Sequence, residues 1–578
     1  MANDIKTAAD VSSGGPTARG SSPPARLPEI WDSAAQWVAY GLARGLTSER
    51  IRHDKSLLYV DGKPVDTYDA RDAIGRALES HSSATPAPAP SGQRPKQQEK
   101  GPGLKQIIAH IEDHFDFYLT EDGDLFAIEV GAPALPIMLG ARGTRLARKV
   151  KAHFWNEKDA NVPGKVLDDA MEILIAKWAE AGERVTLHLR AYADGGLVVI
   201  DLGIPGSSRC VAIRPGNWSV EDQPPAGIFF RRPASLQPLP EPAEDGSWDG
   251  FRETLGLAAD DERWLLARGW LVASVFGDVP RPILFPIGPP GSGKTNTGHA
   301  IVNVLDPRKE LGSSFGKSLD DDQVKASSRF LVGYDNLTSV SENLSDHVCR
   351  LVTGDSTEKR TLYSDDGLTV LAYKRTGVMT AVTLPYFRSD ALERVIPLYF
   401  ERRETKVAER ALRSAFEAAH PAALAALCDG VARVLDRLPD VMAANPQGPR
   451  MVDYWMVLLA HDEQCAEAYR LSTKSTLREA GEQDPFASAI RDWVATDALC
   501  IKSGTATDLL VAWKRWMGEA GNFFGPHDTY VPRDGTRFSA ALTRATETLA
   551  AIGVRVDSRK SNGRRVTTIN YLKPEEDQ

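Results

Sequence analysis

Hydrophobic and polar residues along this 578-residue chain form patterned blocks that are separated by two proline-rich breaks. The breaks, SSATPAPAPSGQRPKQQEKGPG at 82–103 and RPASLQPLPEPAEDGSW at 232–248, contain almost no periodic apolar residues and predict linkers. Because single hydrophobic cores stop growing at roughly 250–300 residues, we expect several domains. The blocks predict an α/β multidomain protein with these segments: 1–28 a disordered tail, 29–81 a small N-terminal domain, 104–231 an α/β module, 249–405 a larger α/β core, 406–480 a helical region, and 485–574 a C-terminal domain of helices and strands.

Local spacing predicts individual elements within these blocks. In the N-terminal domain AAQWVAYGLARGL has helical spacing, and LLYVDGKPV predicts a hairpin that turns at Asp61-Gly62. In the α/β module VTLHLRAY and GLVVIDLG predict strands. The same module contains ARGTRLARKVKAHFW, which places Arg142, Arg145, Arg148, Lys149 and Lys151 close together on an expected helix. An exposed scaffold helix is the commoner explanation for such a basic cluster.

Composition and charge narrow the classes of protein. The chain is 42% hydrophobic and 25% charged, without an apolar run near the ~18 residues of a membrane span. Residues 1–28 lack the apolar stretch of a secretory signal, and the five cysteines lie far apart without a C-x-x-C pair. We therefore expect a cytoplasmic protein without membrane contacts. Because the net charge is −9, any DNA contact must be local.

The block at 282–305, PILFPIGPPGSGKTNTGHAIVNVL, predicts a strand, a phosphate-binding loop of the form G-x-x-x-x-G-K-T, and a helix. Glycines let the loop turn so that its N–H groups face phosphate oxygens, and the helix start adds partial positive charge. Lys294 would neutralise the β- and γ-phosphates of ATP, and the Thr295 hydroxyl would bind Mg²⁺. The predicted nucleotide-binding residues are Gly288, Pro289, Pro290, Gly291, Ser292, Gly293, Lys294 and Thr295.

A second segment, RFLVGYDN, predicts an apolar strand that ends in Asp335 about forty residues after the loop. We expect this carboxylate to hold Mg²⁺ together with Thr295. The next residue, Asn336, is unusual in an ATPase, because an amide cannot take a proton from the attacking water. It can still orient that water.

These motifs resemble the superfamily 3 helicases of the AAA+ class, especially the ATP-binding proteins of phages, phage satellites and bacterial mobile elements. The resemblance covers about Val185–Phe400 and depends on GPPGSGKT, GYDNLTSVSENLSDHVCRLVTGDSTEKRTLYSDDG and RSDALERVIPLYFE. It implies an AAA+ P-loop core with a parallel sheet, acting as an ATP-dependent DNA helicase or replication initiator. It also implies a ring, expected to be a hexamer, with single-stranded DNA in its channel.

The resemblance implies roles for two further residues. Thr380, in GVMTAVTLP, stands where the family has a polar sensor of the γ-phosphate, usually Asn. Arg394, in SDALERVIPL, corresponds to the arginine finger that completes a neighbouring subunit's site, a role worth about 10³–10⁵ in rate in comparable enzymes. The alternative is an ion pair of Arg394 with Asp390 within the chain, in which case Arg388 is the reserve candidate.

Between the strand of Asp335 and that of Thr380, RTLYSDDGLTVLAYKR predicts a hairpin that turns at Asp365-Asp366-Gly367. In superfamily 3 rings this hairpin faces the channel and binds DNA. The tip here is acidic and should repel phosphates, so the candidate DNA contacts lie at its base. They are Lys359, Arg360, Lys374 and Arg375, and a solvated rim explains them equally well.

The C-terminal block predicts a helix at Thr536–Ile552 and two strands around Ser561-Asn562-Gly563, an order typical of a winged helix. Basic residues outnumber acids here, which favours binding of duplex DNA over packing of the domain against its own ring. The candidate contacts are Arg537, Arg544, Arg559, Lys560, Arg564 and Arg565.

Two other functions remain open for the whole chain. In the first, ATP binding assembles the protein as a nucleotide-controlled switch without unwinding. The second is a DNA-binding regulator, which the complete phosphate motif disfavours.

Overall fold

The computed structural model describes most of the chain after residue 100 and three short strands before it. The described residues are 51–54, 57–60, 63–65, 101–139, 145–312, 319–337, 342–360, 368–385, 387–404, 407–519, 530–561 and 564–572. The chain divides into two compact units, Met1–Gln98 and Glu99–Gln578, which are described separately.

The first unit contains an antiparallel sheet in the order β1-β2-β3. Its strands are β1 (Ile51–Asp54), β2 (Leu57–Val60) and β3 (Lys63–Val65). Val60 pairs with Lys63, which confirms the hairpin that LLYVDGKPV predicts. The expected helix of AAQWVAYGLARGL and the tail at 1–28 lie outside the described residues.

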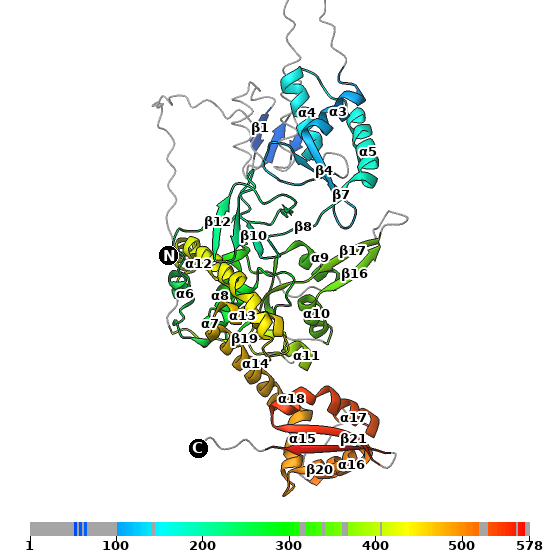
Figure 1. The fold of residues 1–578 in the computed structure, drawn as a ribbon, viewed down its shortest axis with the longest axis vertical. Coiled ribbons are helices and arrows are strands. Elements are labelled where there is room, and N and C mark those ends of the chain that lie inside the picture. The colour runs from blue at the N-terminus through cyan, green and yellow to red at the C-terminus, as the bar shows by residue number, and fades with distance from the viewer. Residues whose placement is uncertain are drawn as a thin grey trace, which may run out of the picture. The chain divides into compact units, whose positions relative to one another are not determined.

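The second unit begins with a small α/β module that has its own core, hereafter the α3–α5 module (Figure 1). Ile107, Phe117, Leu146 and Leu174 lie in this core and bring together three helices and one sheet. The sheet has the order β6-β5-β4-β7. The elements are α3 (Leu104–His114), β4 (Phe115–Leu119), β5 (Leu125–Glu129), β6 (Ile137–Met138), α4 (Arg145–Lys158), α5 (Gly164–Ala181) and β7 (Glu183–Arg184).

A second sheet follows, and its apolar face belongs to a different core. Val198, Val211 and Ile213 pack in the large central cluster rather than with the α3–α5 module. The block at 104–231, predicted as one module, is therefore divided between two cores. This sheet has the order β12-β11-β10-β9, and the elements are β8 (Leu187–His188), β9 (Ala191–Asp194), β10 (Leu197–Asp201), β11 (Cys210–Arg214), β12 (Asn217–Glu221) and β13 (Phe229–Phe230).

The segment 232–248, expected to be a linker, packs against the protein. Arg232 forms an ion pair with Asp201, whose side chain is 1% exposed, at 2.5 Å. The buried Arg190 side chain donates to the main-chain oxygens of Asp201 at 2.9 Å and Gln237 at 2.7 Å. Since an unpaired buried charge is costly, these contacts hold the segment in place despite its proline-rich sequence.

The centre of the unit is a parallel sheet in the order β15-β18-β14-β19, which confirms the predicted α/β class with a parallel sheet. All five residues of β14 are buried, as expected for a strand covered on both faces. The strands are β14 (Ile283–Ile287), β15 (Leu331–Leu337), β18 (Thr376–Ala381) and β19 (Val395–Tyr399). The flanking helices are α6 (Asp249–Leu255), α7 (Glu262–Ala273), α8 (Lys294–Leu305), α9 (Leu319–Ser328), α10 (Glu342–Thr353) and α11 (Ser389–Leu392).

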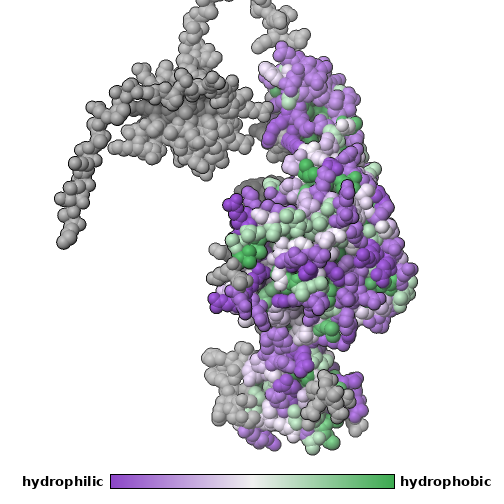
Figure 2. All heavy atoms as spheres, turned by 90° about the vertical axis from the view of Figure 1, so that its left-hand side faces the viewer, coloured by the Kyte–Doolittle hydropathy of each residue, from purple (hydrophilic) through white to green (hydrophobic). Residues whose placement is uncertain are grey.

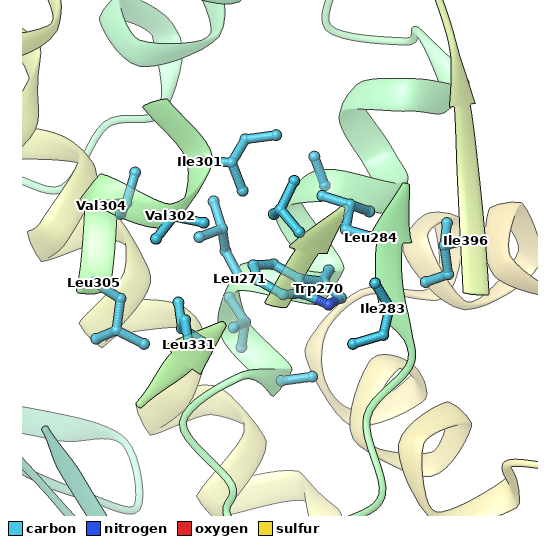
Figure 3. Close-up of a cluster of buried hydrophobic side chains, with 14 of the residues drawn as sticks. Trp270, Leu271, Ile283, Leu284, Ile301, Val302, Val304, Leu305, Leu331 and Ile396 are labelled. Atoms are coloured by element: carbon cyan, nitrogen blue, oxygen red, sulfur yellow. The ribbon is translucent and has the colours of Figure 1, made fainter. Parts of the chain in front are cut away.

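Helix α7 anchors one end of this sheet through Trp270, which is fully buried (Figure 3). Its indole lies among Ile283, Leu284 and Ile396 from the strands, with Leu305 of α8 on the other side of the cluster. The indole N–H is shared between the Pro282 carbonyl at 2.8 Å and the Thr376 hydroxyl at 3.2 Å. Trp270 thereby connects α7 to the residue before β14 and to the first residue of β18.

A hairpin and three helices complete the core. The hairpin pairs β16 (Asp355–Arg360) with β17 (Leu368–Tyr373), and its expected turn at 365–367 lies outside the described residues. The helices are α12 (Glu409–Ala444), α13 (Val452–His461) and α14 (Glu463–Gln483). Among the described helices α12 is the one long and apolar enough to cross a membrane, but 61% of its apolar window is buried inside the protein. Helix α12 is therefore a core helix. The face of the second unit that Figure 2 shows is mostly hydrophilic.

The C-terminal region forms a separate core around Trp493, Trp513 and Phe538. Its sheet has the order β20-β22-β21 and is antiparallel. The helix predicted at Thr536–Ile552 is divided into two, because the chain leaves helical geometry at Ala545. The elements are α15 (Pro485–Ala495), β20 (Ile501–Gly504), α16 (Ala506–Glu519), α17 (Gly535–Arg544), α18 (Thr546–Ala551), β21 (Val554–Ser561) and β22 (Arg564–Tyr571).

Candidate functional site

The loop between β14 and α8 has the backbone that its glycines predict. Gly291 and Gly293 have φ angles of +86° and +83°, in the left-handed region that favours glycine. A Cβ on Gly288 would lie 2.4 Å from the Phe400 oxygen and 2.8 Å from the Ser292 hydroxyl oxygen. The loop therefore needs glycine both for its turns and for its close contact with the chain after β19.

Three polar side chains of this loop and of α8 are buried, and they have no partner among the residues that the structure describes. Lys294 is 9% exposed, and within the part of the chain that the structure describes its ammonium has no hydrogen bond or ion pair. The hydroxyls of Ser292 and Thr297 are also buried and unpaired. Since buried polar groups are nearly always satisfied, these unpaired groups indicate a site for an anionic, hydrogen-bonding ligand.

Asp335 lies beside this loop at the carboxyl end of β15. Its Oδ1 accepts a hydrogen bond from the Thr295 hydroxyl at 2.9 Å and one from the Thr380 hydroxyl at 2.6 Å. Because β18 is inserted between β14 and β15, Thr380 stands between the loop and the carboxylate. The tertiary structure thus brings together Lys294, Thr295, Asp335 and Thr380 from three neighbouring elements.

The fully buried Thr380 hydroxyl both donates and accepts a hydrogen bond. The proton goes to Asp335, and the oxygen accepts from the backbone N–H of Asn336 at 2.9 Å. Asn336 has a φ of +57° at an irregularity in the pairing of β15 with β18. A non-glycine residue in this conformation is strained by about 1–3 kcal/mol, and such strain is common at functional sites. Thr380 therefore positions both Asp335 and Asn336.

Arg403 adjoins the loop, although the sequence patterns did not single it out. Its backbone N–H donates to the Gly291 oxygen at 3.3 Å, and its side chain donates to the Leu255 oxygen at 3.1 Å. The guanidinium packs so closely on Gly293 that a Cβ there would lie 2.8 Å from it. In the sequence this contact is indicated only by two adjacent basic residues, Arg402 and Arg403, shortly after β19.

The two arginine-finger candidates lie next to α11 and have partners within the chain. Arg394 donates to the main-chain oxygen of Asp390, a different contact from the ion pair considered above. Arg388 forms ion pairs with Asp346 at 3.0 Å and Asp390 at 3.8 Å. Of the two, Arg388 is thus the more completely engaged with acids.

The hairpin cations differ among themselves. Arg375 donates to the Ala326 oxygen at 3.0 Å, and burial, with the nearby charge of Arg231, lowers its pKa to about 10. Lys374 donates to the Asp278 oxygen at 2.5 Å. These hydrogen bonds attach the base of the hairpin to the core, and DNA contact by the two residues stays a prediction. Lys359 and Arg360 lie on β16, and their side chains are outside the described part.

The C-terminal candidates lie on the surface of their domain. Lys560 of β21 stands directly opposite Arg565 of β22, and both are exposed. Like charges opposite each other destabilise a sheet, so this pair indicates an anionic partner. Arg559 is exposed beside them, and Arg537 and Arg544 are exposed on α17. Arg564 pairs with Ser561 in the sheet, while its side chain lies outside the described part.

Comparison with known protein families finds one family model that matches part of this chain. The model of the actinomycete integrative conjugative element replication protein matches residues 254–478, the part that holds the loop, Asp335, Thr380 and Arg394. This similarity supports a role related to replication. No curated protein matches the chain.

Solved structures resemble the chain only weakly. The apo A form of the NrS-1 C-terminal region is 11% identical with a TM-score of 0.36, covering 82% of this chain and 100% of that one. The active helicase Cch of SCCmec type IV is 10% identical with a TM-score of 0.38, covering 79% and 93%. The JCV helicase has a TM-score of 0.19 at 12% identity, covering 40% and 70%. At these TM-scores the likenesses establish neither fold nor function.

Proposed function

We propose that this chain is a cytoplasmic, ATP-dependent DNA motor of the superfamily 3 AAA+ class that unwinds DNA or initiates replication for a mobile genetic element. The observation that carries the proposal is the 2.9 Å hydrogen bond from Thr295 to Asp335, which joins a glycine-rich loop to a strand-end carboxylate. The similarity of residues 254–478 to a replication protein supports the mobile-element part.

The residues around the loop fit a triphosphate. Lys294, Ser292 and Thr297 offer donors that have no partner among the described residues, and the start of α8 adds the partial charge of a helix N-terminus. Within the described residues no group of three His, Cys, Asp or Glu side chains could hold a metal by itself. Bound Mg²⁺ would supply neutralisation of phosphate charge, with Thr295 and Asp335 as its side-chain ligands and phosphate and water as the rest.

The chain's own residues divide the remaining work. Lys294 binds and orients the phosphates, while Thr380 holds the Asp335 carboxylate through its 2.6 Å hydrogen bond. Because the Thr380 hydroxyl donates its hydrogen bond to Asp335, we assign Thr380 a positioning role rather than direct sensing of the γ-phosphate. Asn336, held in its strained conformation by the same hydroxyl, is the candidate for orienting the attacking water.

Completion of the site by a neighbouring subunit follows from the resemblance. Arg394 is the proposed finger, since its contact within the chain is to a main-chain oxygen and leaves no buried carboxylate unpaired. Arg388 is less suited, because reaching a neighbouring subunit would break its ion pairs with Asp346 and Asp390. The proposed assembly is a ring, a hexamer by family resemblance.

The C-terminal region supports recognition of duplex DNA as a winged helix. Its order of helix, strand, three helical segments and a two-stranded hairpin is compatible with such a domain, with α17 as the presented helix. The opposed Lys560 and Arg565 would reach phosphates from the wing formed by β21 and β22.

Strand displacement on a forked duplex tests the proposal. The wild type should unwind with ATP and Mg²⁺, and Lys294→Ala should lose hydrolysis and unwinding by at least roughly 100-fold. DNA-stimulated hydrolysis without any unwinding would instead establish the nucleotide-controlled switch. Protein that neither binds nor hydrolyses ATP would refute both.

Mixed subunits test the finger. Lys294→Ala lacks the loop lysine but keeps Arg394, and Arg394→Ala has the reverse defect. If Arg394 acts on a neighbour, mixing the two inactive proteins should restore part of the ATPase rate. Restoration with Arg388→Ala in place of Arg394→Ala would move the role to Arg388, and no restoration with either would remove the shared site.

A further inference from the structure

Helix α4, whose place in the α3–α5 module is labelled in Figure 1, has an unusual outer face. Its inner face is apolar, with Leu146, Val150 and Phe154 buried at every fourth position. On the outside Trp155 is 61% exposed, although tryptophan side chains are among the more buried on average. Since Trp155 is not part of the module's core and most of its surface is exposed, the indole is available to a ligand.

Basic residues surround this indole. Arg148 and Lys151 come seven and four residues before Trp155, and Lys158 comes three residues after it. These spacings place the three cations on the same face of the helix as the indole. Lys151 and Lys158 have no ion pair within the described part of the chain. The one acid of α4, Glu157, is two residues from Trp155 and so lies on nearly the opposite side.

The neighbouring positions leave the indole accessible. Ala152, one turn before Trp155, is exposed and small, so it does not cover the ring. Lys149, which belongs to the same basic cluster, points elsewhere and pairs with Glu129. The outer face is therefore an aromatic ring between cations, spread over about 15 Å of helix from Arg148 to Lys158.

We propose that the outer face of α4 binds single-stranded DNA, with a base stacked on Trp155 and phosphates bound by Arg148, Lys151 and Lys158. An aromatic ring flanked by cations suits this ligand because every base has a face that can stack and every nucleotide a phosphate. Duplex DNA fits less well, since its base faces are covered by their neighbours. The face of α4 thus adds a second DNA contact, remote in sequence from the winged helix.

This inference rests on the proposed function only in taking DNA as the ligand. The α3–α5 module has its own core and does not contain the loop, Asp335 or Thr380. Changes on α4 should therefore leave ATP hydrolysis in the absence of DNA unchanged, whereas failure of the nucleotide site would abolish it. The two failures are distinguishable.

The experiment titrates full-length protein with a fluorescent oligothymidylate and follows both anisotropy and tryptophan emission. Trp155→Ala should weaken binding roughly tenfold, since stacking on an aromatic side chain is worth that order per base. Trp155→Phe should retain most of the affinity but lose the part of the emission quenching that Trp155 contributes. Lys151→Gln with Lys158→Gln should reduce the slope of log affinity against log salt by about 1.4.

Lys165→Gln is the matched control, because it removes one exposed charge from α5 of the same module and should change neither signal. Unchanged affinity and quenching in Trp155→Ala would overturn the proposal. So would a change of oligomeric mass in Trp155→Ala without DNA, which would assign the face to contacts between copies of this chain.

Discussion

The proposed nucleotide site and the C-terminal domain place their polar residues in opposite ways. Around Asp335 the Thr380 hydroxyl is buried and the Thr295 hydroxyl is partly buried, and the carboxylate oxygen Oδ1 already has both as donors before any ligand is considered. On the C-terminal domain Lys560 and Arg565 are exposed and face each other without a compensating acid between them. Buried, pre-oriented groups suit a reaction that tolerates little displacement, whereas exposed cations suit a long, flexible polyanion.

The difference predicts unequal sensitivity to mutation. A single change at the buried site removes an interaction that nothing else can replace, and it also leaves a partner unsatisfied. A single change on the exposed surface removes one of several similar phosphate contacts. The following variants test this contrast, in order of decreasing expected effect.

Asp335→Asn should have the largest effect. The amide has nearly the same shape as the carboxylate but lacks the negative charge that is proposed to bind Mg²⁺. The ATPase rate should therefore fall by roughly 100-fold or more while the fold is retained. Steady-state hydrolysis across a Mg²⁺ series, with circular dichroism as the folding control, measures this. A rate within twofold of the wild type would exclude Asp335 from the metal site.

Thr380→Val should have an intermediate effect. Valine has a similar shape but leaves the Asn336 N–H without its acceptor and Asp335 without its 2.6 Å donor, which should cost about 1–3 kcal/mol of stability. Hydrolysis should fall roughly tenfold as Asp335 and Asn336 lose their orientation. Thr380→Ser, which keeps the hydroxyl, is the control and should recover most of the rate. A normal rate in Thr380→Val together with a loss in Thr380→Ser would show that the methyl group, not the hydroxyl, matters.

Lys560→Gln with Arg565→Gln should have the smallest effect. Affinity for duplex DNA should fall severalfold, and its salt dependence should flatten by about 1.8 because two phosphate contacts are lost. Arg555→Gln offers a control on β21, since Arg555 already pairs with Asp557 at 3.3 Å. ATP hydrolysis without DNA should be the same in all three proteins. A salt slope equal to that of the wild type would remove the wing from the DNA interface.

Short-range patterns predicted much of the fold. The hairpin of β2 and β3, the strand–loop–helix around Lys294 and the paired strands β21 and β22 all depend on residues close in sequence, and the structure contains each of them. The proline-rich segment 232–248 was misjudged, because its sequence resembles a linker while Arg232 and Gln237 have partners distant in the chain. Proline limits the local backbone but does not prevent such contacts.

The sequence by itself determined which chemistry is present: the glycines that permit the loop, the lysine and threonine that follow it, and the excess of cations near the C-terminus. The tertiary structure alone decided which of these residues meet. The order β15-β18-β14-β19 placed Thr380 against Asp335, the chain after β19 placed Arg403 on Gly293, and the packing of the hairpin gave Arg375 a partner in the Ala326 oxygen. The physical reason is that residue type and spacing specify local conformation, whereas partners far apart in sequence are specified only by how the elements pack.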